Sequence, residues 1–283
     1  MIGVFDSGHG GLTVYRALAE RFPDLSFVYL GDHANAPYGN RPSEEVVDLT
    51  RTAVETLFRR GARLVLLGCN TATCVAARTL QQDWLPHSEW KGRNVLGIVA
   101  PTVEAATQTP WAVTTPQYPQ RNNTDVIAVF GTTRTITSYV YPEEIRKRCP
   151  RVTVVQQIAA DLAGSIEMGR PVDELEAIVA RAVEGLLAQT GGRAPHSAIL
   201  GCTHFPLVEH LFRRHLPPAT RILSQPAIVA DSLEDYLARR PHYRGESASD
   251  PEILLLTTGD AGAVTGIARL NWPDAPAFTN ITL

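Results

Sequence analysis

Short apolar runs rich in valine, isoleucine and leucine alternate along the chain with longer amphipathic stretches, and this alternation most constrains the possible folds. A short run that is apolar throughout predicts a strand covered on both faces, which is typical of parallel sheets with crossover helices. The pattern therefore predicts an α/β protein. The predicted strands are Ile2–Phe5, Ser26–Leu30, Leu64–Leu67, Val95–Val99, Val126–Phe130, Val152–Val155, Ala198–Leu200 and Ile253–Leu256. The predicted helices include Leu12–Arg21, Ser43–Arg60, Val172–Ala188 and Leu207–Leu216, with another expected to begin at Thr102.

The second half of the chain repeats the pattern of the first. Ile2–Asp6 and Ile127–Gly131 are both strand-like runs followed by small or hydroxyl residues and a helix. Leu66–Thr71 has a counterpart in Ile199–His204, and each copy places a Gly-Cys pair directly after a strand. Two copies of one α/β unit predict two similar domains, with one Gly-Cys corner in each.

Composition narrows the class of protein. A chain of 283 residues is long enough for two domains of roughly 100–200 residues each, and 44% hydrophobic residues indicate a folded globular protein. A net charge of -3 gives no indication of a nucleic-acid or anionic-membrane partner. No segment approaches the ~18 uninterrupted apolar residues that a membrane span needs. The first residues run straight into a strand without a basic segment, so we expect no signal peptide and a cytoplasmic protein.

The chain has four cysteines, at positions 69, 74, 149 and 202. They are too sparse for a disulfide scaffold, and none forms a CxxC pair or another common zinc spacing. We therefore expect free thiols and no metal. Cys74 and Cys149 are interpreted as small buried side chains.

Polar residues follow several predicted strands directly, at the strand ends where parallel sheets bind their ligands. A carboxylate at these corners would meet backbone N–H groups, hydroxyls and the positive ends of helices. The glycine run Asp6–Gly11 lacks the spacing of a dinucleotide site and the lysine of a phosphate-binding loop. The corner residues are Asp6-Ser7, Cys69-Asn70-Thr71, Thr132 and Cys202-Thr203-His204.

The paired Gly-Cys corners favour one kind of chemistry. Inverting a carbon centre without a cofactor needs a base on one face and a conjugate acid on the other. Two thiols facing each other across a domain cleft would supply both, one as thiolate and one as thiol. His204 lies two residues after Cys202 and is placed to polarise it, and Asp6 is expected to act comparably near Cys69.

The corner residues resemble the motifs of the aspartate/glutamate racemase superfamily and, within it, of the glutamate racemases. Phe5–Leu12 is similar to the opening motif, and Gly31-Asp32 with Pro37–Asn40 is similar to a second substrate loop. Gly68–Ala72 and Gly201–Leu207 match the two cysteine motifs. The resemblance spans nearly the whole chain, and the ordered set is specific although each piece is modest. Weaker matches are Gly131-Thr132, Thr135-Ile136 and Thr258–Asp260.

Carried over residue by residue, the resemblance implies that Cys69 and Cys202 are the proton donor and acceptor. It implies that Asp6 and His204 assist the two thiols and that Glu167 is a further assisting carboxylate. The carboxylates and ammonium group of the substrate would be bound by Asp6, Ser7, Pro37, Tyr38, Gly39, Asn70, Thr71, Thr132, Thr135, Thr203 and His204.

The resemblance also implies a function and an architecture. The expected reaction interconverts L- and D-glutamate without metal or other cofactor and supplies D-glutamate for bacterial peptidoglycan. Glutamate is the expected partner, with no nucleic acid and no membrane, and a homodimer is the expected assembly. The implied fold has two similar flavodoxin-like domains, residues 1–98 plus 210–283 and residues 99–209, with the active site in the cleft between them.

The chain departs from the usual family pattern at several places. His9 stands where the family has a small aliphatic residue, which brings a titratable group to the neighbourhood of Asp6. Arg134 replaces a usual glycine. Residues 107–125 and 239–250 are expected to form surface loops. These departures bear on regulation, packing or cleft access more than on the type of reaction.

Three alternatives remain open. The nearest is an aspartate racemase or a related amino-acid racemase, although the Asp-Ser-Gly opening and the Cys-Thr-His triplet favour glutamate. A non-catalytic role as a gyrase-binding inhibitor is disfavoured, because the chain begins at its first strand without the N-terminal extension that such members often have. A hydrolase using Cys202 and His204 would lack a separate orienting Asp or Asn.

Overall fold

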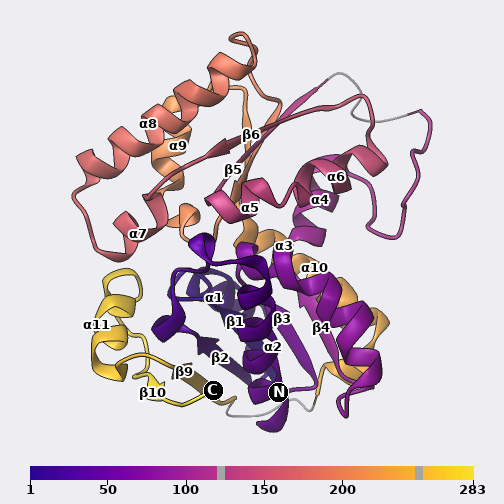
Figure 1. Ribbon diagram of the computed structural model, residues 1–283, viewed down its shortest axis with the longest axis vertical. Helices are drawn as coiled ribbons and strands as arrows, with labels where there is room; N and C mark the ends of the chain where they lie inside the picture. The colour runs from indigo at the N-terminus through magenta and orange to yellow at the C-terminus, as the bar shows by residue number, and fades with distance from the viewer. Residues whose placement is uncertain (120–124, 246–250) are drawn as a thin grey trace.

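The computed structural model describes residues 1–119, 125–245 and 251–283, and within these residues the strands form two parallel sheets (Figure 1). The strands are β1 Ile2–Asp6, β2 Phe27–Gly31, β3 Leu64–Leu67, β4 Asn94–Gly97, β5 Val126–Gly131, β6 Thr153–Ile158, β7 Ser197–Gly201, β8 Arg221–Leu223, β9 Ile253–Thr257 and β10 Thr279–Asn280. The first sheet has the order β10-β9-β2-β1-β3-β4, and the second has the order β6-β5-β7-β8. The predicted α/β fold with parallel sheets is confirmed.

Helices form the crossover connections that parallel strands require. The α-helices are α1 Leu12–Arg21, α2 Ser43–Arg59, α3 Asn70–Thr79, α4 Val99–Thr107, α5 Thr133–Thr137, α6 Val140–Arg148, α7 Leu162–Glu167, α8 Val172–Gln189, α9 Glu209–His215, α10 Gln225–Arg239 and α11 Ala261–Asn271. Short helical turns are η1 His33–Asn35, η2 Tyr38–Asn40, η3 Leu80–Trp84, η4 Leu85–His87, η5 Phe205–Val208 and η6 Pro241–Tyr243.

The two sheets share one strand order, which gives the sequence repeat a structural basis. The segment β2-β1-β3-β4 of the first sheet corresponds to β6-β5-β7-β8 of the second. β1 and β5 therefore occupy equivalent central positions, and β3 and β7 lie next to them as the strands that end in Gly-Cys corners. In Figure 1 the six-stranded sheet fills the lower half of the view and the four-stranded sheet the upper half.

Helices cover both faces of each sheet, which explains why its central strands are apolar throughout. On the first sheet, α1, α10 and α11 bury one face, and α2 and α3 bury the other. On the second sheet, α7, α8 and α9 cover one face, and α4 and α6 cover the other. Cys69 and Cys202 follow β3 and β7 at the ends of these buried strands.

The chain passes between the two units at α4 and at α10. Val103 of α4 packs in the core of the second sheet, whereas Leu233 of α10 packs in the core of the first. Between them, Phe212 of α9 also belongs to the second core, and β8 pairs with β7. The domain boundaries expected from the sequence place the return of the chain to the first domain at residue 210. We propose instead that this return begins at α10.

Two local expectations need correction or restriction. The predicted strand Val95–Val99 ends at Gly97, because α4 already begins at Val99. Thr102 therefore lies inside α4, where its Oγ1 donates to the Ile98 carbonyl, and it does not begin the helix. In the first predicted loop, residues 108–119 contain no helix or strand, and residues 120–124 fall outside the described residues. In the second predicted loop, η6 lies within residues 239–245, and residues 246–250 fall outside the described residues.

A buried polar network lies where α4, α6 and α10 meet the first residue of α3. The Gln225 and Asn70 side-chain amides pair, with Asn70 Nδ2 donating to Gln225 Oε1 at 2.6 Å. The Tyr141 hydroxyl donates to Asn70 Oδ1 at 2.8 Å and accepts from Gln225 Nε2 at 3.1 Å. Gln225 Nε2 also donates to Thr102 Oγ1. Because all four side chains are buried, loss of one partner leaves another without its hydrogen bond.

We expect Tyr141→Phe to lower the free energy of unfolding by about 1–3 kcal/mol, the usual cost of leaving buried polar groups unsatisfied. The matched control is Tyr15→Phe, because the Tyr15 hydroxyl is buried without a hydrogen-bond partner among the described residues. Tyr15→Phe should leave stability unchanged or raise it. Urea denaturation followed by circular dichroism measures both, and equal losses in the two variants would contradict the network.

Candidate active site

Both Gly-Cys corners open into one cavity of about 650 Å³, which is lined by residues from both units. Cavities that bind small molecules typically measure roughly 300–1,000 Å³. Cys69 follows β3 and caps α3, and Cys202 follows β7. Each thiol is only 6% exposed, so a molecule in the cavity would meet both sulfurs in a largely dry environment. Cys74 and Cys149 do not line this cavity.

The Cys69 sulfur lies at a helix N-terminus. Its Sγ is 3.5 Å from the Ala72 backbone nitrogen, whose N–H donates to it, and 3.5 Å from Ser7 Oγ. These contacts favour a thiolate, but burial and the nearby Asp6 carboxylate outweigh them and raise the pKa of Cys69 to about 12. Cys69 is therefore a thiol at neutral pH.

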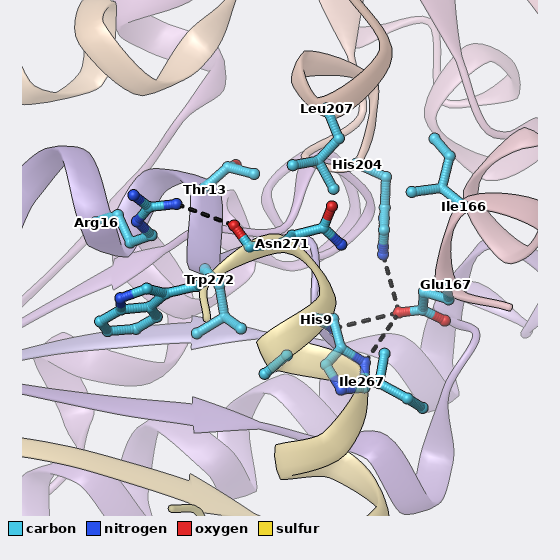
Figure 2. A pocket seen from close by; sticks show the side chains of 12 residues that line it. His9, Thr13, Arg16, Ile166, Glu167, His204, Leu207, Ile267, Asn271 and Trp272 are labelled. Atoms are coloured by element: carbon cyan, nitrogen blue, oxygen red, sulfur yellow. Dashed lines mark hydrogen bonds and ion pairs between the residues drawn. The ribbon is translucent and has the colours of Figure 1, made fainter. Parts of the chain in front are cut away.

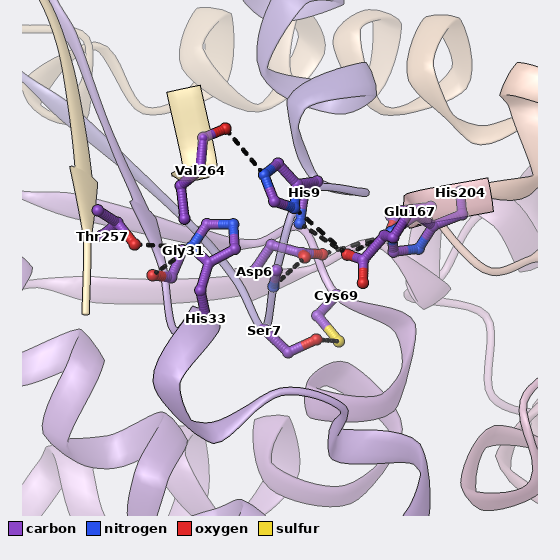
Figure 3. Close-up of polar contacts among 12 residues, drawn as sticks. Asp6, Ser7, His9, Gly31, His33, Cys69, Glu167, His204, Thr257 and Val264 are labelled. Carbon is purple, nitrogen blue, oxygen red and sulfur yellow. Dashed lines mark hydrogen bonds and ion pairs between the residues drawn. The ribbon is translucent and has the colours of Figure 1, made fainter. Parts of the chain in front are cut away.

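Cys202 has a different neighbour. Its Sγ is 3.7 Å from His204 Nδ1, and His204 Nε2 is 2.8 Å from Glu167 Oε1. Burial opposes a charge on His204, yet the hydrogen bonds to Cys202 and Glu167 hold its pKa well above the usual range. Burial likewise opposes a charge on Glu167, and the hydrogen bonds from His204 and His9 hold its pKa well below the usual range. Figure 3 shows this ion pair beside Cys69 and Asp6.

Asp6 lies at the end of β1, behind the wall of the cavity. Its Oδ1 accepts from the Gly8 backbone N–H at 2.8 Å, and its Oδ2 accepts from Thr203 Oγ1 at 3.2 Å. The second bond ties the first unit to the corner that carries Cys202. Burial raises the pKa of Asp6, although the charge on His204 acts in the opposite direction.

The structure brings most of the residues singled out in the sequence to the cavity wall. Asp6 and Thr135 are the exceptions, because both are buried behind it. Thr135 instead joins a hydroxyl cluster in which its Oγ1 lies 3.1 Å from Thr132 and 3.3 Å from Thr71. The residues that do line the cavity are Ser7, Pro37, Tyr38, Gly39, Cys69, Asn70, Thr71, Thr132, Glu167, Cys202, Thr203 and His204.

Asp32 organises the loop that carries Pro37–Gly39. It is fully buried and accepts hydrogen bonds from Tyr38 Oη at 2.6 Å and Thr258 Oγ1 at 2.7 Å. The Tyr38 hydroxyl therefore points at Asp32, and the loop is tied to the segment after β9. Thr258 lies in one of the weaker sequence matches, and this contact gives that match a structural role.

Sequence reasoning missed part of the cavity wall. Thr133 follows Thr132 at the start of α5, and Asn40 ends the Pro37–Asn40 motif, so both had a signal in the sequence. In the stretch around α7 only Glu167 had a signal, from the family resemblance, and the neighbouring residues form no motif of their own. The other lining residues of this stretch are Ala159, Ala160, Asp161, Ala163, Gly164, Ser165, Met168 and Arg170.

The residues that the structure describes contain neither a cluster of metal-ligating side chains nor a helix suited to span a membrane. No group of three or more His, Cys, Asp or Glu side chains there is arranged to hold a metal ion. Within the same residues, no helix combines the length and apolar character needed to cross a membrane.

Comparison with known proteins places the chain in a family. The family model for Asp/Glu/Hydantoin racemase matches residues 2–232. A glutamate racemase from Phenylobacterium zucineum (strain HLK1) is 48% identical over 98% of both chains, and one from Caulobacter sp. (strain K31) is 46% identical over 96% of both. The crystal structure of a glutamate racemase isoform from Bacillus anthracis superposes with a TM-score of 0.84 at 26% identity, covering 100% of this chain and 97% of that one. The chain therefore belongs to the Asp/Glu/Hydantoin racemase family and, within it, to the glutamate racemases, which are isomerases.

Proposed function

We propose that this chain interconverts L- and D-glutamate without a cofactor, with Cys69 and Cys202 as its two opposed acid/base groups. The observation that carries the proposal is that both buried thiols line one cavity, each with its own polar assistant. Identity of 48% to a glutamate racemase over nearly the whole chain supports glutamate as the substrate. We further infer that the reaction takes place in the cytoplasm, that its product serves peptidoglycan synthesis, and that the enzyme is a homodimer.

The proposed reaction transfers two protons and involves no oxidation or reduction. A thiolate takes the α-proton from one face, and the C–H electron pair remains on the α-carbon. A thiol on the other face then gives up its proton, and a new C–H bond forms with inverted configuration. Each turnover exchanges the protonation states of Cys69 and Cys202, and the reverse reaction restores them.

The surroundings of the two sulfurs give them different resting states. The His204 imidazolium donates its Nδ1–H toward Cys202 and stabilises negative charge there, while its Nε2–H is held by Glu167. Burial and Asp6 keep Cys69 protonated. We therefore assign Cys69 as the group that starts as proton donor, and Cys202, which lies beside the His204 ring, as the group that starts as proton acceptor.

Substrate binding is assigned to the groups that surround the sulfurs. The Ser7, Thr71 and Thr132 hydroxyls and the N-terminus of the ten-residue α3 suit carboxylate oxygens. Asn70 is oriented by its amide pair with Gln225, which uses one of its two Nδ2–H donors. Thr203 and the Pro37–Gly39 segment complete the wall, Thr135 supports the hydroxyls from behind, and Asp6 assists the Cys69 side.

Circular dichroism of each pure enantiomer should show the optical signal of glutamate decaying to zero in the presence of a chelator and without pyridoxal phosphate. We expect aspartate to react about 10–200-fold more slowly, because one missing methylene changes binding by that amount. A stable glutamate signal would contradict the proposal. Faster loss of the aspartate signal would identify the enzyme as an aspartate racemase.

Replacing either thiol should abolish racemisation in both directions, because each direction needs one base and one acid. We expect Cys69→Ser and Cys202→Ser to lower kcat by at least about 10²–10⁴-fold. The control is Cys149→Ala, a buried cysteine that does not line the cavity, which should retain wild-type kcat. Near-normal turnover in either serine variant would refute the two-base scheme.

Glu167→Gln should move the alkaline limb of the kcat profile to lower pH. Glu167 helps to raise the pKa of His204, so its neutral replacement lets the imidazolium lose its proton earlier. We expect a displacement of about one to two pH units, because a hydrogen bond to a charged group contributes about 1.5–3 kcal/mol. Glu143→Gln, an exposed glutamate on α6, is the control and should leave the profile in place. An unmoved limb in Glu167→Gln would show that this carboxylate does not support His204.

A further inference from the structure

His9 lies in the turn between β1 and α1, and it contacts the carboxylate that holds His204. Its backbone N–H donates to Glu167 Oε1 at 3.2 Å, and its ring Nδ1 lies 3.5 Å from the same oxygen. The His9 side chain is only 12% exposed. The sequence placed this histidine near Asp6, but its described side-chain contacts are with Glu167, Val264 and His33.

The other ring nitrogen fixes the tautomer of His9. Nε2 lies 3.1 Å from the Val264 carbonyl oxygen on α11, and a carbonyl only accepts hydrogen bonds. Nε2 therefore carries the hydrogen in the neutral ring, and Nδ1 presents a lone pair to Glu167. When the ring is protonated, Nδ1 presents an N–H to that carboxylate instead. The charge of His9 thus acts directly on Glu167 Oε1.

Two histidine rings, His9 and His33, pack against each other here. His33 lies edge-on to His9 with ring centroids 4.3 Å apart, and Nε2 of His33 is buried without a partner among the described residues (Figure 3). Burial and the charge of His9 lower the pKa of His33 to about 3, so it stays neutral. The charged groups that line the small cavity beside His9 are Glu167, His204 and Arg16 of α1, and the buried Asp6 carboxylate at the end of β1 interacts electrostatically with both Glu167 and His204.

His9 does not reach the space where the substrate is proposed to bind. A second, small cavity of about 40 Å³ lies behind the ion pair, and Glu167 and His204 line both cavities. His9 lines only the small one (Figure 2). We therefore expect His9 to influence the reaction through its contact with Glu167.

We propose that His9 is a positioning residue that makes the Glu167–His204 pair sensitive to pH. Both histidines use the same carboxylate oxygen, so they compete for it. While the His9 ring is neutral, Glu167 Oε1 receives hydrogen bonds from the His204 ring and from the His9 backbone N–H, but none from the His9 ring. When His9 is protonated, it shares Oε1 and loosens the hold on the His204 ring. In the context of the proposed function, this weakens the support that His204 gives to Cys202.

The first test is proton NMR of the histidine rings and does not depend on catalysis. In the wild-type protein the His204 ring signal should show a second inflection at the pH where His9 titrates, because the two rings are coupled through one carboxylate. The His33 signal should not titrate between pH 5 and 9. His9→Gln keeps an N–H donor for Val264 without a titrating ring, and it should remove the second inflection.

The second test compares kinetics of the same variants. In His9→Gln, kcat should fall less steeply toward low pH than in the wild type. At the acid end of the profile, the ratio of kcat to its maximum should be about tenfold higher than in the wild type, which is the change that one pKa unit produces. His210→Gln, an exposed histidine on α9, should behave as wild type in both tests. Glu167→Gln with His9 intact should also remove the second inflection. This variant provides the test if His9→Gln does not fold.

The outcomes separate the two proposals. A single inflection for His204 in the wild type, or a second inflection that survives in His9→Gln, overturns the role of His9. Failure of the wild type to racemise glutamate overturns the proposed function but leaves the NMR result valid. An acid limb that is identical in His9→Gln and wild type shows that any coupling does not reach the reaction.

Discussion

The placement of the site depends on one constraint, which is that the central strands of both parallel sheets are buried on both faces. Helices occupy those faces with apolar side chains, and the polar groups of the site gather at the strand ends. β3 and β7 hold equivalent places in the two sheets, and each ends in Gly-Cys. Residues that follow β3 and residues that follow β7 line the same cavity.

The duplicated scaffold carries two unlike electrostatic settings. On one side, the Cys69 thiol has a helix N-terminus and Ser7 but no imidazole, and burial keeps it protonated. On the other, Cys202 lies beside an imidazolium that Glu167 holds in its charged form. The proposed two-base reaction needs one acid and one base at the start of each turnover, and we propose that this difference provides them.

The polar contacts that join the two units also orient the site. Asp6 is linked to Thr203, and Asn70 is paired with Gln225 and Tyr141 from the second crossover and α6. Each of these bonds is buried, so it is strong only while the two units keep their relative position. The same contacts that hold the cavity wall in place therefore couple its shape to the packing between the units.

The sequence by itself determined the α/β class, the duplicated α/β unit and the two Gly-Cys corners. These features are local, because an apolar run, the turn after it and the next helix are read within a few residues. The family motifs added Glu167, although its surroundings resemble them only loosely. The sequence also identified His9 as unusual and expected it near Asp6, but it gave no sign of the contact with Glu167.

Tertiary structure alone decided which polar groups touch. His9 meets Glu167 across 158 positions of sequence, and Asn70 meets Gln225 across 155. It also decided that Asp6 and Thr135 lie behind the cavity wall and that the stretch around α7 forms part of it. Strand and helix periodicity specifies which face of an element is buried, but not which distant side chain it meets there. Hydrogen-bond partners and the resulting pKa shifts depend on these contacts between distant side chains. The contacts form only once the two sheets have packed together.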